Sequence, residues 1–333
     1  MMIEIWLLNY GAVYLVCQGT QTIPQIAVLH SEHHLYSQPV NNLHWGYDTS
    51  GVQGAVFSLL EHSYGVDILD EWAPASRIAE FPVVVAPEQD KMSDAMVATL
   101  KRYVAQGGRL LVTGAAAVDR FGKKFLGVKK VKREGEKCCF IPSGDGNYAV
   151  FSKTWALIEP VTARSLGRLG LSCLTDGKLT RYAAAVVNRV GRGLVAYAPF
   201  DLFRDFKYNR YPPARVFIGE LIEALKPEMA IRVSAPVCVD VVLRRKGRAA
   251  VIHLINRGSG IPQNPDSGAV DAIPDSAPVT IRMQVGARPK QVRAVLENTR
   301  ITWRFKPGRS TRGGGEVTIA VPRIAIHAAV TVE

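Results

Sequence analysis

The stretch FPVVVAPEQDKMSDAMVATLKRYVAQGGRLLVTGAAAV, residues 81–118, decides the fold of this chain. Its apolar run Val83–Ala86 has the composition of a strand buried on both faces. Ser93 suits a helix N-cap, and apolar residues then recur at helical spacing up to Gly107, the first of a glycine pair. Leu110–Val112 is a second apolar run. The stretch therefore predicts a strand, a helix and a strand of a parallel sheet.

The two loops that follow these strands are the first candidate site, because ligands of open α/β sheets bind at the carboxyl ends of the strands. Residues 86–89 read APEQ and residues 113–117 read TGAAA. A hydrolase or amidotransferase of this architecture carries Ser or Cys on the sharp turn after a strand. Gly114, Ala115 and Ala116 stand there instead. We predict a vacant nucleophile turn, no glutaminase activity and an accessory role.

The same alternation of strand and helix extends to both sides of this unit. Apolar strands are predicted at Gln25–Leu29 and Val66–Leu69, and a last helix at Ala214–Leu225. Further strands are predicted at 138–141, 148–152, 183–188 and 194–198, with a hairpin turn at 191–193 between the last two. This pattern predicts an α/β domain with a flavodoxin-like, doubly wound parallel sheet. Short alternating strands then predict a small all-β antiparallel sandwich. The predicted parts are an N-terminal remnant or linker (1–24), the α/β domain (25–227) and the β-sandwich (229–333).

The composition of the 333 residues is that of a globular protein, with 47% hydrophobic and 21% charged residues. No apolar run reaches the length of about 18–20 residues that a membrane span needs. The apolar start of the chain has no basic flank, which disfavours a secretory signal. The five cysteines show neither a metal spacing nor a pairing pattern, which indicates a reducing compartment. We therefore expect a cytoplasmic protein.

The formal net charge of +12 is unevenly distributed. The first 100 residues carry two bases against eleven acids, and the rest carries 39 bases against 18 acids. Basic residues cluster at 244–248, at 282–312 and within 121–137, a glycine-broken stretch that predicts a loop. Such clusters are typical of surfaces that bind anionic polymers. Aromatic residues are sparse in them (Trp303 and Phe305 are the nearest), which disfavours nucleic acid as the partner.

Candidate site residues gather around the expected strand ends. Five of the seven histidines lie in the first 62 residues, but the adjacent His33 and His34 cannot both face one ion from a strand. We therefore predict no metal site and no cofactor. Carboxylates near strand ends are candidates for a glycosidase pair or for loop caps, and aromatic residues for sugar stacking or packing. The candidate sugar-rim or interface residues are His30, Glu32, His44, Trp45, Tyr47, Asp48, Glu88 and Asp201.

Several motifs taken in order resemble those of a known arrangement. They are QIAVLHS at 25–31, VVVAP at 83–87, GGRLLVTG at 107–114, VNRVGRGLVAY at 187–197 and PFD at 199–201. These resemble the beta-galactosidase trimerisation domain, a class I glutamine-amidotransferase-like fold. The later motifs VIHLIN at 251–256 and PRIAIH at 322–327 are similar to the C-terminal β domain of the same enzymes, bacterial beta-galactosidases and alpha-L-fucosidase-like glycoside hydrolases. The resemblance covers roughly nine tenths of the chain.

The resemblance implies a supporting role. Those enzymes hold their catalytic carboxylates on an N-terminal barrel of about 250 residues, and this sequence has about 24 residues before its first predicted strand. We therefore expect a non-catalytic accessory or oligomerisation region that walls or supports an active site carried on another domain or chain. The implied partners are copies of itself, as a trimer, or a barrel-containing glycosidase chain, with carbohydrate as ligand. Two alternatives stay open: a self-sufficient glycoside hydrolase that uses Glu32, Glu88 or Asp201, and a binder of anionic polymer.

Overall fold

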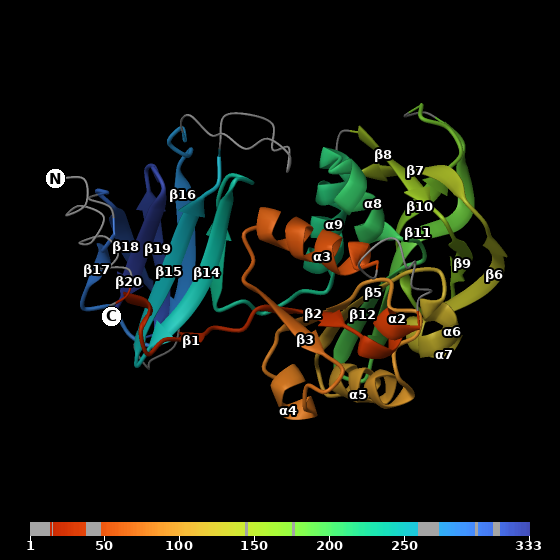
Figure 1. Ribbon diagram of the computed structural model, residues 1–333, viewed down its shortest axis with the longest axis horizontal. Coiled ribbons are helices and arrows are strands. Elements are labelled where there is room, and N and C mark those ends of the chain that lie inside the picture. The colour runs from red at the N-terminus through yellow and green to blue at the C-terminus, as the bar shows by residue number, and fades with distance from the viewer. Residues whose placement is uncertain are drawn as a thin grey trace. The chain divides into compact units, whose positions relative to one another are not determined.

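The computed structural model describes residues 14, 16–37, 48–143, 146–174, 177–258, 273–296, 299–308 and 314–333 (Figure 1). The chain has a mixed α/β fold with several sheets. Its contacts divide it into two compact units. The α/β unit comprises residues 25–59 and 66–228, and the β unit comprises residues 60–65 and 229–333 with the described part of 1–24.

The α/β unit contains a nine-stranded sheet in the order β3-β2-β4-β5-β12-β11-β10-β7-β8. The first five strands pair in parallel. They are β3 (Val66–Asp70), β2 (Ile26–His30), β4 (Val83–Ala86), β5 (Arg109–Thr113) and β12 (Gly193–Ala198). The other four pair antiparallel, and they are β11 (Leu179–Val190), β10 (Arg164–Gly170), β7 (Lys137–Ser143) and β8 (Gly146–Ser152). The sheet is therefore mixed, whereas the sequence predicts a parallel one.

The change of direction has a local cause. A two-residue turn joins β11 to β12, and Gly191 in this turn has a φ of 58°. Such a short connection makes a hairpin, so the two strands must run antiparallel. A Cβ atom on Gly193 would lie 2.1 Å from the backbone oxygen of Val104, so glycine is needed for the close approach. The two glycines of the motif VNRVGRGLVAY at 187–197 are thus explained by the hairpin turn and the close backbone approach.

Helices cover both faces of this sheet in Figure 1, with α3, α8 and α9 on one side and α4 and α5 on the other. Their bounds are α2 (Glu32–Tyr36), α3 (Ser50–Glu61), α4 (Ala75–Ile78), α5 (Asp94–Ala105), α6 (Ala117–Phe121), α7 (Lys123–Leu126), α8 (Leu202–Asn209) and α9 (Pro212–Ala224). The predicted strand Val83–Ala86 and the helix after Ser93 are confirmed, and the Ser93 side chain accepts a hydrogen bond from the Met96 amide.

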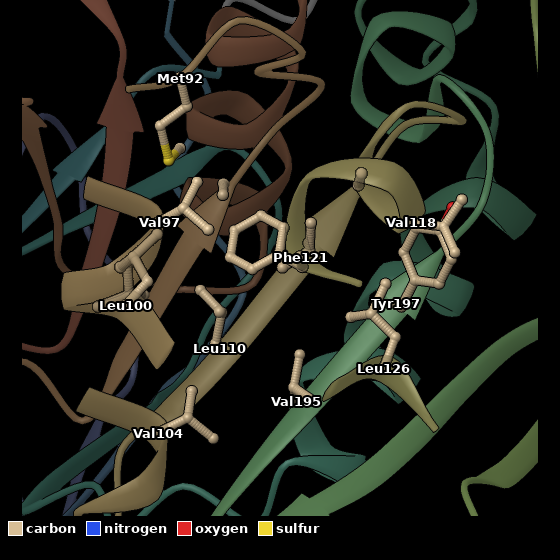
Figure 2. Close-up of a cluster of buried hydrophobic side chains, with 14 of the residues drawn as sticks. Met92, Val97, Leu100, Val104, Leu110, Val118, Phe121, Leu126, Val195 and Tyr197 are labelled. Atoms are coloured by element: carbon tan, nitrogen blue, oxygen red, sulfur yellow. The ribbon is translucent and has the colours of Figure 1, made fainter. Parts of the chain in front are cut away.

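The core of this unit lies between α5 and the sheet. Figure 2 shows Leu100 of α5, Leu110 of β5 and Tyr197 of β12 among its buried side chains. The predicted loop at 121–137 is wrong, because part of it forms α7 and β6 (Val128–Glu134). This strand pairs with β9 (Trp155–Pro160) in a sheet of two strands.

The β unit contains two antiparallel sheets whose buried side chains form one apolar cluster. The first sheet has the order β1 (Gln21–Thr22), β14 (Val239–Lys246), β15 (Ala249–Asn256), β20 (His327–Val332) and β17 (Val292–Ala294). The second has the order β13 (Ile231–Ser234), β16 (Val279–Val285), β19 (Gly315–Val321) and β18 (Thr302–Pro307). Among the helices of the described residues, none combines the length and apolar character that a membrane crossing requires.

Candidate functional site

A pocket lies in the α/β unit, where the order of the parallel strands reverses. The strand β2 has β3 on one side and β4 on the other. The connection that follows β2 therefore runs to one side of it, and the connection that follows β3 runs to the other side. A crevice forms at such a switch point and is the usual ligand site of open α/β sheets. The pocket here measures about 270 Å³. Its charged and titratable lining residues are His30, His34, Asp48, Glu88, Asp90, Lys153, Asp201 and Arg204.

The structure brings four of the eight predicted site residues into this pocket: His30, Asp48, Glu88 and Asp201. Glu32 does not line it, and its carboxylate instead accepts a hydrogen bond of 2.5 Å from the Trp72 ring nitrogen. The other three predicted residues, His44, Trp45 and Tyr47, lie outside the described residues.

Glu88 lies in a tight backbone turn of the site. It stands two residues after β4 and has a φ of 49°, a left-handed backbone conformation that residues with a Cβ atom rarely adopt. Its amide donates to Thr113 Oγ1 at 3.2 Å, and the Thr113 hydroxyl donates back to Glu88 Oε1 at 2.7 Å. Oε1 also accepts from the Phe203 amide at 3.0 Å. The backbone turn and one carboxyl oxygen are thus fixed by neighbouring strand ends.

The turn predicted to be vacant lies beside Glu88 and has a structural role. Gly114 has a φ of 101°, and its amide donates to the backbone oxygens of Ala198 and Phe200. Gly114, Ala115 and Ala116 are absent from the pocket lining. A Cβ atom on Gly114 would lie 3.3 Å from Glu88 Cα. The residue that the sheet presents to the pocket from this region is therefore Glu88.

Burial gives the pocket an unusual protonation state. Desolvation, together with the nearby charge of Asp201, raises the pKa of Glu88 from 4.5 to about 8. The same two causes raise the pKa of Asp90 to about 6. Burial also raises the pKa of Asp201, against an opposing hydrogen bond from Ser152. Glu88 is therefore a neutral carboxylic acid at pH 7.

The position of its proton follows from the hydrogen bonds. Because Glu88 Oε1 accepts two hydrogen bonds, Oε2 is the oxygen that carries the proton. Oε2 is shielded from solvent and has no hydrogen-bond partner among the described residues. It points toward Gly51, where an added Cβ atom would lie only 2.3 Å away. A donor is thus held in the pocket without an acceptor from the protein.

One of the two cations in the pocket lining, Arg204, is neutralised by a neighbouring carboxylate. Arg204 forms an ion pair with Asp48, whose Oδ1 accepts from the Ser50 amide at the start of α3. Burial would raise the pKa of Asp48, but hydrogen bonds from Ser50 and Arg204 outweigh it and lower the pKa to about 2. Burial lowers the pKa of His34. Asp48 therefore serves α3 and Arg204 as a fixed negative charge.

A second carboxylate, Glu71, supports the loops around the pocket from outside it. It accepts hydrogen bonds from the Ser31 hydroxyl at 2.5 Å, the His33 amide at 2.9 Å and the Ser93 amide at 2.6 Å. These donors lie at the starts of α2 and α5. Burial would raise the pKa of Glu71, but these bonds lower it to about 2. Sequence reasoning missed this residue.

Sequence reasoning also missed Asp90, Lys153 and Arg204 in the lining. The signal for Asp90 and Arg204 was the one that selected Glu88 and Asp201, because all four follow strands of the sheet within a few residues. Applied to every charged residue after a strand, the same rule would have found them. The signal for Lys153 is similar, since it directly follows the antiparallel strand β8.

The fold is similar to solved structures of glycoside hydrolases. Alpha-L-fucosidase isoenzyme 2 from Paenibacillus thiaminolyticus matches with a TM-score of 0.72 and 19% identity, over 98% of this chain and 51% of that one. The beta-galactosidase from Bacillus circulans sp. alkalophilus gives 0.63 and 14% over 98% and 44%, and that from Rahnella sp. R3 gives 0.59 and 15% over 94% and 41%.

The chain thus spans about half the length of these enzymes, or less. No protein-family model and no curated protein matches the sequence. At these identities the likeness establishes the fold alone.

Proposed function

We propose that this chain is a non-catalytic accessory or oligomerisation region of a glycoside hydrolase, which walls or supports an active site carried on another domain or chain. The observation that carries the proposal is the similarity over 98% of this chain, both units included, to about half of a fucosidase. The proposal includes assembly, as a trimer or with a barrel-containing glycosidase chain, and a cytoplasmic location, for which the cysteine spacing is the support.

The finer assignment of the α/β unit is part of this proposal. We assign its parallel half to the flavodoxin-like, doubly wound type and to the trimerisation domain of beta-galactosidases. In its support, the five parallel strands taken in chain order lie in the order 2-1-3-4-5, with helices on both faces. The antiparallel strands β11, β10, β7 and β8 extend that sheet on one side.

The test of assembly is size-exclusion chromatography with light scattering on the full chain. We expect the mass of a homo-oligomer, or a mass increase on mixing with a barrel-containing glycosidase chain from the same organism. A strict monomer that associates with no such chain would refute the proposal.

A second candidate, a self-sufficient glycoside hydrolase, is favoured by one observation. Glu88 and Asp201 line one pocket, and the pKa of Glu88, about 8, keeps it protonated as a general acid must be. The third carboxylate of this hypothesis, Glu32, lies outside the pocket lining. The test is hydrolysis of a panel of nitrophenyl glycosides. This candidate requires activity that Glu88→Gln and Asp201→Asn abolish and that the exposed Glu220→Gln control retains, whereas the accessory role requires none.

A further inference from the structure

Two buried polar atoms in the pocket at the carboxyl ends of β2 and β4 have no partner in the described part of the chain. They are Nε2 of His30, the last residue of β2, and Oε2 of Glu88, two residues after β4. Nearly all buried polar groups in folded proteins are hydrogen-bonded to protein or to ordered water. Two unpaired atoms on residues that line the same pocket therefore mark a place where ordered water or a ligand supplies the missing bonds.

The two atoms offer definite hydrogen-bonding chemistry. Oε2 of Glu88 is a donor at neutral pH, because Oε1 already accepts from Thr113 and Phe203. An imidazole nitrogen such as Nε2 of His30 donates or accepts according to its tautomer. The carboxylate of Asp201 adds an acceptor to the same lining. A ligand that fits this set must both donate and accept hydrogen bonds, as hydroxyl groups do.

The charges and the size of the pocket select a neutral and small molecule. An anion would meet the carboxylates of Asp48, Asp90 and Asp201. Of the two cations in the lining, Arg204 is already paired with Asp48 and Lys153 is exposed to solvent. Among the described residues no group of acidic, histidine or cysteine side chains is placed to hold a metal ion. Pockets for drug-sized ligands measure about 300–1,000 Å³. The volume of about 270 Å³ here suits a single ring with its substituents.

We propose that this pocket binds a neutral polyhydroxylated molecule, a monosaccharide or a cyclic polyol, through the carboxylic acid of Glu88 and the ring nitrogen of His30. The proposal goes beyond the accessory role, because it gives the α/β unit a ligand of its own at the switch point of its sheet. It holds whether or not the chain assembles with a barrel domain, so a titration and the light-scattering measurement test separate statements.

The experiment is calorimetric titration of the full chain with galactose, fucose, mannose and inositol at millimolar concentration, with galacturonate and galactosamine as the charged counterparts of galactose. We expect at least one neutral probe to bind, and more tightly than its charged counterparts. Gly51→Ala places a methyl group 2.3 Å from Glu88 Oε2 and should weaken binding about tenfold or more. The exposed Glu220→Gln variant is the matched control and should bind as the unmodified chain does. Circular dichroism checks that each variant is folded.

The pH profile supplies a second measurement that does not depend on the alanine variant. Binding of the neutral probe should weaken as pH rises through about 8, where Glu88 loses its donor proton. In Glu88→Gln this loss should disappear, because an amide keeps its donor at all these pH values. The other titratable or charged groups of the lining are His30, His34, Asp48, Asp90, Lys153, Asp201 and Arg204, and Tyr148 interacts with Glu88 from outside the lining. The proposal is overturned if no neutral probe binds, if a charged probe binds more tightly, or if folded Gly51→Ala binds unchanged.

Discussion

Replacing Glu88 by glutamine should make the stability of the α/β unit less sensitive to pH. The side chain keeps its size, and its amide oxygen can accept the hydrogen bonds that Oε1 receives from Thr113 and Phe203. What changes is the ionisable proton. The folded chain holds this proton up to a pH of about 8, while the unfolded chain releases it near 4.5. Between these values the unfolded state binds fewer protons, so the free energy of unfolding falls as pH rises.

The magnitude follows from the two pKa values. The rise from 4.5 to about 8 corresponds, at about 1.36 kcal/mol per pH unit, to an upper limit of about 5 kcal/mol. Because Glu88 as a whole residue remains partly accessible to solvent, we expect about half of this limit, about 2–3 kcal/mol. Glutamine carries no such cost. Asp90 and Asp201 are present in both the unmodified chain and Glu88→Gln. The comparison therefore uses the difference in unfolding free energy between these two proteins.

The assay is urea unfolding of the unmodified chain, Glu88→Gln and the control Glu220→Gln near pH 5, 7 and 9. Tryptophan fluorescence follows the unfolding, and Trp155, which is fully buried in the α/β unit, is among the five tryptophans that contribute to it. We expect Glu88→Gln to match the unmodified chain near pH 5 and to be more stable by about 2–3 kcal/mol near pH 9. A difference that stays constant with pH, or a less stable variant near pH 9, would refute the reasoning.

Three further substitutions test the packing and the loop supports in the same unfolding assay. Gly54→Ala places a Cβ atom 1.8 Å from the backbone oxygen of Phe203, so it should destabilise the α/β unit by about 1–3 kcal/mol, whereas Gly135→Ala, with open space around it, should be neutral. Glu71→Gln should cost about 1–3 kcal/mol at pH 7, and the cost should vanish as pH falls from 4.5 through about 2, where the native carboxylate also becomes protonated. Asn188→Ala removes the side-chain amide that donates to the Phe125 backbone oxygen at 2.8 Å, and should cost about 1–3 kcal/mol. Equal stability of variant and control would count against each of these assignments.

The parallel core was predictable because its signals are local. The apolar run of β4 and the helical spacing of α5 report burial directly, and Ser93 marks the start of the helix through a bond three residues away. The antiparallel extension of the sheet was predictable in part. The sequence predicts strands within β7, β8, β11 and β12 and the hairpin turn that joins the last two. Strands β10 and β6 were not predictable, because their sequences carry no strand pattern. The strand β6 is the clearest case, since its basic sequence has no strand alternation and it forms by pairing with the buried strand β9.

The candidate site was half predictable for a similar reason. Glu88 and Asp201 follow strands, so their place near the carboxyl edge of the sheet could be predicted. That they line one pocket, and Glu32 does not, could not be predicted from the sequence. The backbone turn at Glu88 could not be predicted either, because glutamate has no preference for the left-handed region. Glycine is the usual sign of a sharp turn after a strand, so the sequence predicts the vacant nucleophile turn at Gly114 and not at Glu88. A left-handed backbone conformation at a residue type that rarely adopts it cannot be predicted from sequence patterns.

That unfavourable conformation is an argument for function at Glu88. A left-handed residue with a Cβ atom costs about 1–3 kcal/mol, and a buried polar atom without a partner costs a similar amount. Glycine would relieve the backbone, but the Glu88 side chain also has a structural role, because its Oε1 accepts hydrogen bonds from Thr113 and Phe203. Neither the left-handed backbone nor the unpaired Oε2 is needed for those two bonds. Both costs fall on the residue that the switch point presents to the pocket, beside a second unpaired atom on His30. Stability alone gains nothing from these two costs, whereas a ligand that accepts a hydrogen bond from Oε2 would offset part of them.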